Sequence, residues 1–260
     1  MNKFSFVGAA GIALGVIGTA CAADLPLERP AKASFESRFT WTGCYLGAHV
    51  GGAWERKDAT DPVQLVQDNA TLGGFPGNTN ITTTRVNPSG AVIGGQIGCD
   101  YQLASGFVIG IEGAASGSTL KGSTQVALPQ GNPGETALVT VRTDFMPALT
   151  GRIGYAVDHW LVYGKGGAAW ANDKYSVTGT FLAAPFDFEG LNLRTGWTVG
   201  AGVEWAFAED WSARFEYDYY DFGRQTVTMN DTVNGAGPVS FRQSAQTVKL
   251  GLNFHVWGWQ

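Results

Sequence analysis

Residues 194–205, RTGWTVGAGVEW, decide the fold. Two kinds of side chain alternate along this stretch, one mostly apolar and the other small, polar or charged. The first set is Thr195, Trp197, Val199, Ala201, Val203 and Trp205, and the second is Arg194, Gly196, Thr198, Gly200, Gly202 and Glu204. A period of two predicts a β-strand with one apolar face. A tilted strand of about ten residues is long enough to cross a bilayer.

Seven other segments repeat this alternation, at 42–54, 91–102, 107–115, 142–155, 161–170, 211–221 and 246–256. Within each segment, the charged side chains share the face opposite the large apolar ones. In 142–155, for example, the polar face is expected to include Arg142, Asp144 and Arg152. The sequence therefore predicts eight strands of the same kind.

The connections between these segments alternate in length. Three are short, at 103–106, 157–160 and 208–210, and four are long and rich in Gly, Asn, Thr and Pro, at about 55–90, 116–141, 171–193 and 222–245. Four structureless loops of this length are unusual in a compact soluble domain. Short periplasmic turns alternating with long outer loops are typical of a membrane barrel. We expect an all-β fold, an eight-stranded antiparallel up-and-down transmembrane barrel with four long extracellular loops.

The composition agrees with a β-protein in a membrane. The 260 residues include 37 glycines, 15% are charged and 12% are aromatic. Glycine costs about 1 kcal/mol relative to alanine inside a helix, so its spread along the chain disfavours helices. The aromatic content excludes a disordered chain. Because the net charge is −5, nucleic acid is not expected to be a partner.

A soluble barrel of the lipocalin type also alternates, with its apolar face inward. Here aromatic residues such as Trp54, Tyr155 and Trp205 lie at the ends of the apolar faces, as in the interfacial girdles of a membrane barrel. Glycine on the opposite faces leaves room for long charged side chains in a narrow lumen. The last strand ends with KLGLNFHV at 249–256, which resembles the C-terminal signal that barrel-assembly machinery recognises.

The first residues predict export. Lys3 precedes an apolar run, and Ala20-Cys21-Ala22 supplies the small residues of a cleavage site. This pattern indicates a signal peptide at 1–22 and disfavours a membrane anchor. We expect a periplasmic tail at 23–40 and the barrel at 41–260, so that the mature protein resides in the cell outer membrane.

Four stretches carry a resemblance to a known family: WTGCYLGAHVGGAW at 41–54, GRIGYAVDHWLVYGKGGAAWA at 151–171, GWTVGAGVEWAFAEDWSARFEYDYYDFG at 196–223 and TVKLGLNFHVW at 247–257. They are similar to the opacity-type, OmpA-like outer-membrane porins, and within these to the major surface antigens of alphaproteobacteria. The resemblance covers the expected strands and stops in the long loops, above all 55–90. It implies the barrel fold and the outer-membrane location. The family is called porin more by homology than by demonstrated pores.

Charged side chains, Lys249 among them, fall on the inward faces of the expected strands. Seven of them are expected to interact with one another: Glu112, Arg152, Lys165, Glu204, Arg214, Glu216 and Asp218. An unpaired charge in a lumen of low dielectric constant is costly, so we expect these groups to form a paired network. Eight strands enclose a space that side chains just fill. The network is therefore expected to be a structural plug, with a conducting pore as the alternative.

Cys44 and Cys99 remain after cleavage of the signal peptide, in a compartment that permits disulfides. Both fall on the expected lipid face, near the periplasmic ends of adjacent strands. A cross-strand disulfide and two buried free thiols are both open.

The sequence predicts no catalytic residues, no metal ligands and no cofactor. His49, His159 and His255 have neither metal-ligand spacing nor a convincing Ser-His-acid or Cys-His arrangement around them. Gly164–Ala169 matches a dinucleotide-binding pattern, but a polar loop rather than a helix is expected after it. Some members of the resembled family bind haem at the surface, and Tyr175 is the loop residue that could serve as a ligand here.

The predicted function is a structural and surface role: envelope integrity, a surface antigen, and contacts made through the loops. The expected partners are outer-membrane lipid and lipopolysaccharide, the barrel-assembly machinery, and host or surface ligands. A small-solute porin and a haem-binding surface protein are the alternatives. No enzymatic activity is expected.

Overall fold

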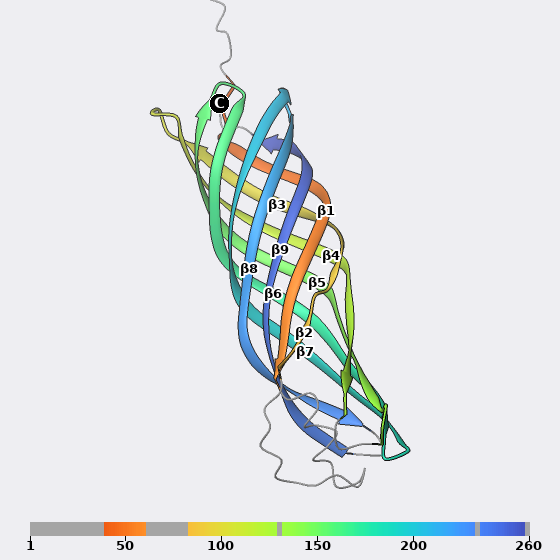
Figure 1. The fold of residues 1–260 in the computed structure, drawn as a ribbon. Helices are drawn as coiled ribbons and strands as arrows, with labels where there is room; N and C mark the ends of the chain where they lie inside the picture. Colours follow the sequence, from red (N-terminus) through yellow and green to blue (C-terminus); the bar gives the residue numbers. More distant parts are fainter. Residues whose placement is uncertain (1–38, 61–82, 129–131, 232–234, 258–260) are drawn as a thin grey trace, which may run out of the picture. The chain divides into compact units, whose positions relative to one another are not determined.

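The computed structural model describes residues 39–60, 83–128, 132–231 and 235–257. These residues form an antiparallel sheet (Figure 1) of the strands β1 (Gly43–Thr60), β2 (Thr83–Val86), β3 (Ser89–Gln102), β4 (Phe107–Ala127), β5 (Thr136–Val157), β6 (Trp160–Phe181), β7 (Ala184–Ala208), β8 (Trp211–Asp231) and β9 (Gly235–Trp257). The predicted signal peptide, 1–22, lies outside the described residues, as do most of the predicted tail and the segment 61–82 of the first long loop. Where the structure is described, no helix is long and apolar enough to span a membrane.

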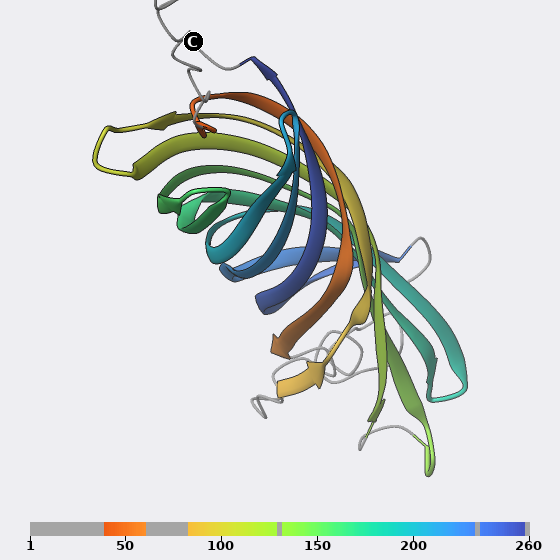
Figure 2. The same ribbon diagram turned by 90° about the horizontal axis from the view of Figure 1, so that it is seen from above.

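Eight of the strands close into a barrel. The sheet order runs β2-β1-β3-β4-β5-β6-β7-β8-β9, and β1 also pairs with β9 up to Thr60↔Ser240. Figures 1 and 2 show orange β1 beside dark blue β9 along this seam. Strand β2 is not a ninth strand of the ring. It pairs with the part of β1 that lies beyond β3, and it does so in the same register as β3. The predicted eight-stranded barrel is confirmed.

The break between β2 and β3 falls at Asn87 and Pro88. Proline has no backbone N–H to donate to the ladder, so regular pairing stops there. The Pro88 carbonyl still accepts a hydrogen bond from the Glu55 N–H, at 2.8 Å. Strands β2 and β3 therefore act as one interrupted wall strand beside β1.

The three short turns lie where the sequence predicts them, but the long connections do not. Most of 116–141, 171–193 and 222–245 is strand rather than loop, and β6 meets β7 through a turn of only Leu182 and Ala183. Strands β4 to β9 contain 21 to 25 residues, about twice the length that a bilayer requires. The wall therefore continues well beyond the membrane on the extracellular side.

Strand β6 shows why the sequence does not predict the extracellular halves of the strands. Its outward series is Val162, Ala168, Trp170, Asn172, Lys174, Ser176 and Thr178, and its inward series is Lys165, Ala169, Ala171, Asp173, Tyr175, Val177 and Phe181. The outward face changes from apolar to polar after Trp170, and the inward side chains above Asp173, which include Tyr175, Val177 and Phe181, are apolar. We call this change the polarity reversal. Above it the strand no longer has the apolar outer face that identifies a membrane strand.

Strand β5 contains an irregularity that corrects one prediction. The register with β6 shifts between Thr143 and Phe145. Such a bulge changes which face the neighbouring side chains occupy. Arg142 and Asp144, expected in the lumen, therefore lie on the outer wall, and Thr143 is buried instead. Arg152, below the shift, lies inside.

Candidate functional site

The lower half of the lumen holds a layer of buried charged side chains, which we call the lower charged layer. All seven residues that the sequence predicts for the network lie in it: Glu112 on β4, Arg152 on β5, Lys165 on β6, Glu204 on β7, and Arg214, Glu216 and Asp218 on β8. Asp100 on β3 and Lys249 on β9 belong to the same layer and are also buried. Every second residue of a strand points inward, so each strand contributes to the layer only side chains of its inward-facing series.

Glu112 and Arg214 form the central pair of this layer. The Arg214 guanidinium donates through Nη1 to Glu112 Oε2. The same carboxylate accepts a hydrogen bond of 2.7 Å from the Tyr45 hydroxyl, and its Oε1 lies 3.3 Å from Lys165 Nζ. Because these side chains come from β1, β4, β6 and β8, the cluster connects strands that are not neighbours in the sheet.

Two lysines share the neighbouring carboxylates Glu216 and Asp218. Lys165 Nζ lies 2.5 Å from Glu216 Oε1 and 3.2 Å from Asp218 Oδ1. Lys249 Nζ lies 3.0 Å from Glu216 Oε1 and 2.6 Å from Asp218 Oδ2. The alternation in the sequence placed Lys249 on an inward face but did not join it to the network. Its partner Glu216 follows from the β8–β9 register, which alternation does not specify.

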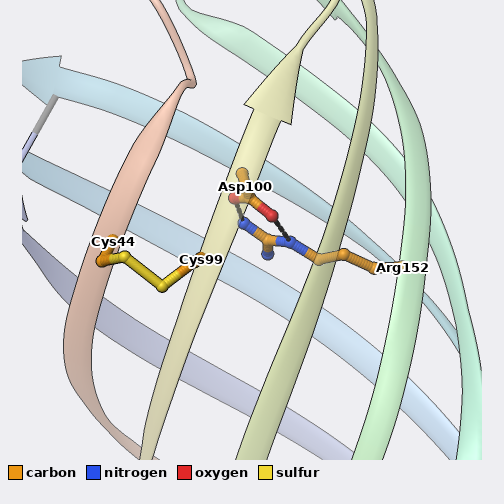
Figure 3. Close-up of a disulfide and its surroundings, with 4 residues drawn as sticks. All are labelled: Cys44, Cys99, Asp100 and Arg152. Atoms are coloured by element: carbon orange, nitrogen blue, oxygen red, sulfur yellow. Dashed lines mark hydrogen bonds and ion pairs between the residues drawn. A yellow bond between two sulfur atoms is a disulfide. The ribbon is translucent and has the colours of Figure 1, made fainter. Parts of the chain in front are cut away.

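Arg152 on β5 connects two further strands, β3 and β7. Its Nε donates to Asp100 Oδ1 at 2.6 Å, and its Nη1 donates to Glu204 Oε2 at 3.2 Å. Figure 3 shows the guanidinium of Arg152 meeting the carboxylate of Asp100. The guanidinium carbon also lies over the rings of Tyr45 and Tyr163, 4.7 and 5.0 Å from their centroids. Charged hydrogen bonds and ring contacts together compensate the burial of this cation.

Glycine makes room for this layer, as the sequence suggests. A methyl group added at Gly110 would overlap the Asp100 carboxylate, and one added at Gly200 would overlap the Asp218 carboxylate. Each of these overlaps also involves a backbone oxygen, so a flexible side chain alone could not relieve it. A larger residue at either position would therefore push a carboxylate away from its cation.

A second charged layer, the upper charged layer, lies closer to the extracellular end. Lys57 Nζ lies 2.8 Å from Asp173 Oδ1 and 3.3 Å from Glu55 Oε2, and Arg194 Nε lies 3.2 Å from Asp173 Oδ2. All four side chains are buried. The alternation in the sequence does not predict this layer, because Glu55, Lys57 and Asp173 fall in segments expected to be loops. Continuing the alternation past the aromatic girdle would have found them.

Three apolar clusters alternate with the two charged layers. The lowest is Trp41, Val108, Ala156, Leu161, Tyr163 and Ala206; the middle one is Ala53, Val92, Leu120, Met146, Ala169, Ala171, Tyr220, Phe222 and Ala245; the highest includes Val141, Tyr175, Val177, Phe181, Phe186, Phe188, Met229 and Phe241. Strand β6 passes them in order, with Leu161, Lys165, Ala169, Asp173 and Phe181 buried in successive layers. Side chains of alternating kinds therefore occupy the lumen along the length of the wall.

Cys44 on β1 and Cys99 on β3 are direct cross-strand partners. The structure joins them by a disulfide with an S–S distance of 2.10 Å. Figure 3 shows this bond beside Asp100, the residue that follows Cys99 and pairs with Arg152. Of the two alternatives left open by the sequence, the structure therefore contains the disulfide and not the free thiols.

The other candidates form no ligand site within the described ranges. Gly164–Ala169 lies inside β6 and is followed by more strand, so it lacks the helix that a dinucleotide motif needs. The assignment of Tyr175 to a surface loop is wrong, because Tyr175 is 3% exposed inside β6. Its hydroxyl donates to Asp173 Oδ2 and accepts from Arg194 Nε, both at 2.9 Å, and this rules it out as a surface haem ligand here. No group of three or more His, Cys, Asp or Glu in the described part of the chain could hold a metal ion.

Comparison with known proteins places these features in context. The family model described as outer membrane protein beta-barrel domain matches residues 30–254. The 31 kDa outer-membrane immunogenic protein of Brucella melitensis is 29% identical over 248 residues, covering 94% of this chain and 97% of the relative. The 25 kDa outer-membrane immunogenic protein of Brucella abortus is 24% identical over 239 residues, covering 91% and 90%. The outer membrane protease OmpT of Escherichia coli shares the fold alone, with a TM-score of 0.51 and 9% identity over 84% of this chain and 98% of OmpT.

Proposed function

The chain belongs to the family of the outer membrane protein β-barrel domain and is an integral outer-membrane protein, and we propose that it is a sealed structural barrel. The observation that carries this proposal is the pairing inside the lumen. Six buried cations, Lys57, Arg152, Lys165, Arg194, Arg214 and Lys249, each lie within ion-pair distance of a buried carboxylate. Removing one partner of a buried pair costs about 3–5 kcal/mol, so opening a water-filled path through both layers would be expensive.

Conductance of the purified, folded protein in planar bilayers tests the sealed barrel. We expect the barrel to insert without opening discrete channels, while an established general porin in the same bilayers conducts. Conductance steps of one fixed size, increasing in number with the number of inserted barrels, would contradict the proposal. That result would favour the small-solute porin instead.

We further propose that the extracellular half of the barrel is the part presented at the cell surface. Above the polarity reversal, the wall has a polar outer face and its own apolar core. Two similar proteins carry names that describe them as immunogenic. A role as surface antigen and contacts with host ligands fit a rigid wall that projects from the membrane. Antibodies against the hairpin tips should therefore label intact cells.

The paired lumen also supports a role without catalysis. In both charged layers, the carboxylates and cations neutralise one another inside the barrel rather than facing a substrate cleft. The likeness to OmpT, a protease, concerns the fold. For assembly, we propose that the machinery that inserts barrels recognises β9, the strand that pairs with β1 to close the ring.

A further inference from the structure

The outer wall distributes its charges unevenly. In the described part of the chain, all exposed lysines and arginines lie in one zone, which we call the basic band: Arg56, Arg85, Lys121, Arg142, Lys174, Arg224 and Arg242. Those on the ring strands lie 13 to 15 residues from the periplasmic ends of their strands. The periplasmic turns contain acids instead, at Asp158, Glu209 and Asp210. The basic band therefore marks one level of the barrel.

Three cations of the band form a row across neighbouring strands. Lys121 on β4 is the cross-strand partner of Arg142 on β5, and Arg142 is the partner of Lys174 on β6. Like charges directly opposite one another destabilise a sheet. One carboxylate, Asp144, pairs with Arg142 and lies 2.9 Å from Lys174 Nζ. Glu189, the exposed partner of Ser176 on β7, is a second acid beside the row. Three cations against two carboxylates leave the row positive, so an external anion would relieve it.

The row lies just above the region that contacts hydrocarbon. On β5, the exposed ring of Phe145 comes three residues below Arg142, and on β6, Trp170 comes four residues below Lys174. Aromatic side chains of this kind lie at the membrane interface. At about 3.3 Å per residue, the cations lie about 10 to 13 Å farther along their strands. This is the level of lipid headgroups in the outer leaflet.

Two exposed leucines lie beside the row. Leu191 on β7 is the cross-strand partner of Lys174, and Leu193 is the partner of Asn172. The two leucines are 73% and 68% exposed, although the outer face of β6 at this level is polar. An inorganic anion gains nothing from such side chains, whereas an amphiphile with phosphate groups and acyl chains can contact both kinds.

We propose that Lys121, Arg142 and Lys174 bind the phosphate groups of an outer-leaflet glycolipid of the lipid A class, with Leu191 and Leu193 against its apolar part. The ligand neutralises cations that otherwise repel one another across the strands. The inference rests on the outer-membrane location of the barrel. It does not depend on whether the lumen conducts, so a failure of either proposal leaves the other standing.

The test compares two triple variants of the full chain, folded and purified in detergent. Lys121→Gln/Arg142→Gln/Lys174→Gln removes the row, and Arg56→Gln/Arg224→Gln/Arg242→Gln removes the same charge from other strands of the basic band. Each protein is titrated with bisphosphorylated lipid A, and the bound fraction is measured by native mass spectrometry. One cation beside an anionic headgroup contributes about fivefold in affinity, so the row variant should bind roughly 100-fold more weakly. The control variant should bind like the parent, and the parent should bind monophosphorylated lipid A more weakly.

Several outcomes would overturn the assignment. Equal weakening in both variants would show general attraction to a basic surface, and unchanged binding of the row variant would exclude the row. Competition by inorganic phosphate with the affinity of lipid A would make the row a free-anion site. Preferential binding of a sulfated polysaccharide would identify a glycan surface instead. If the triple variant does not fold, Lys121→Gln/Lys174→Gln replaces it, with an expected loss of about 25-fold.

Discussion

Arg214 on β8 pairs with Glu112 on β4, and these two strands lie four places apart in a ring of eight. The pair therefore spans the lumen from one wall to the opposite one. Hydrogen bonds of the ladder connect only adjacent strands, so they cannot make this connection. The lower charged layer thus adds transverse links that the backbone ladder of the wall cannot make.

Replacing Arg214 with alanine should loosen the barrel. The substitution leaves Glu112 and Glu216 with one cation fewer in a buried site, and such losses cost about 3–5 kcal/mol. We expect a lower melting temperature in detergent and loss of the compact, heat-modifiable band on a gel. Arg224→Ala, on the exposed face of the same strand, is the control and should change neither. Unchanged mobility and melting of Arg214→Ala would contradict the paired network.

The Cys44–Cys99 bond predicts a simple mass measurement. Mature protein unfolded and alkylated without reductant should gain no alkyl group, and after reduction it should gain two. The double variant Cys44→Ser/Cys99→Ser should lose about 2–4 kcal/mol of stability, since the cross-link restricts the unfolded chain. Alkylation of both cysteines before reduction would instead demonstrate free thiols.

Phe241→Ala should affect the extracellular half selectively. Phe241 is fully buried in the highest apolar cluster and stacks on Tyr175, with ring centroids 4.2 Å apart. Truncating a buried phenylalanine costs about 3–5 kcal/mol. We expect external protease to cleave the upper hairpins of intact cells faster, while the membrane-embedded fragment stays protected. Phe207→Ala, at the periplasmic end and half exposed, should leave cleavage at the parent rate. Equal protection of both variants would show that the upper cluster does not hold the extension together.

Glu135 should make the extracellular tips sensitive to acid. It lies at the β4–β5 tip, and its carboxylate accepts hydrogen bonds from the N–H groups of Ala183 and Leu182 in the β6–β7 turn and of Asn132, at 2.8 to 2.9 Å. These bonds, that of Ala183 first, hold the pKa of Glu135 below its ordinary value of 4.5. Because the folded-state pKa is depressed, the stabilisation is complete above 4.5 and is lost as the pH falls through the folded-state value.

Hydrogen exchange of the Leu182 and Ala183 amides, corrected for the intrinsic rate, measures this link. Their protection should decrease as the pH drops below the ordinary value of 4.5 for the Glu135 carboxyl. In Glu135→Gln, protection should be low and independent of pH. A parent protein whose protection did not change with pH would show that the carboxylate does not hold the two tips together.

The sequence predicts the membrane part of the fold because hydrocarbon imposes one rule on the outer wall. Side chains that face lipid must be apolar, so Trp197, Val199 and Val203 on β7 identify their own strand. Because alternate residues of a strand face opposite sides, the same rule identifies the residues that face the lumen. Glu204 and Arg214 are among these, and both are buried. Short turns follow because two strands must end at the same interface.

Two parts of the structure lie beyond this rule. The first is register: Lys249 meets Glu216, and Cys44 meets Cys99, only because the strands are aligned as they are, and alternation is the same for other alignments. The second is the wall above the membrane, where water accepts polar side chains outside and Tyr175 belongs inside. No rule for lipid-facing residues can identify strands there.

The polarity reversal has a consequence for how the barrel sits in its bilayer. Sinking toward the cell would carry Asn172 and Lys174 into acyl chains, where a cation costs up to about 2–4 kcal/mol at the midplane. Rising away from the cell would lift Trp170 into water and strip lipid from the apolar face below it. Displacement of the barrel in either direction is therefore opposed at the same level, between Trp170 and Asn172 on β6. The protein therefore has one preferred immersion depth, and a membrane of a different thickness must adjust around it.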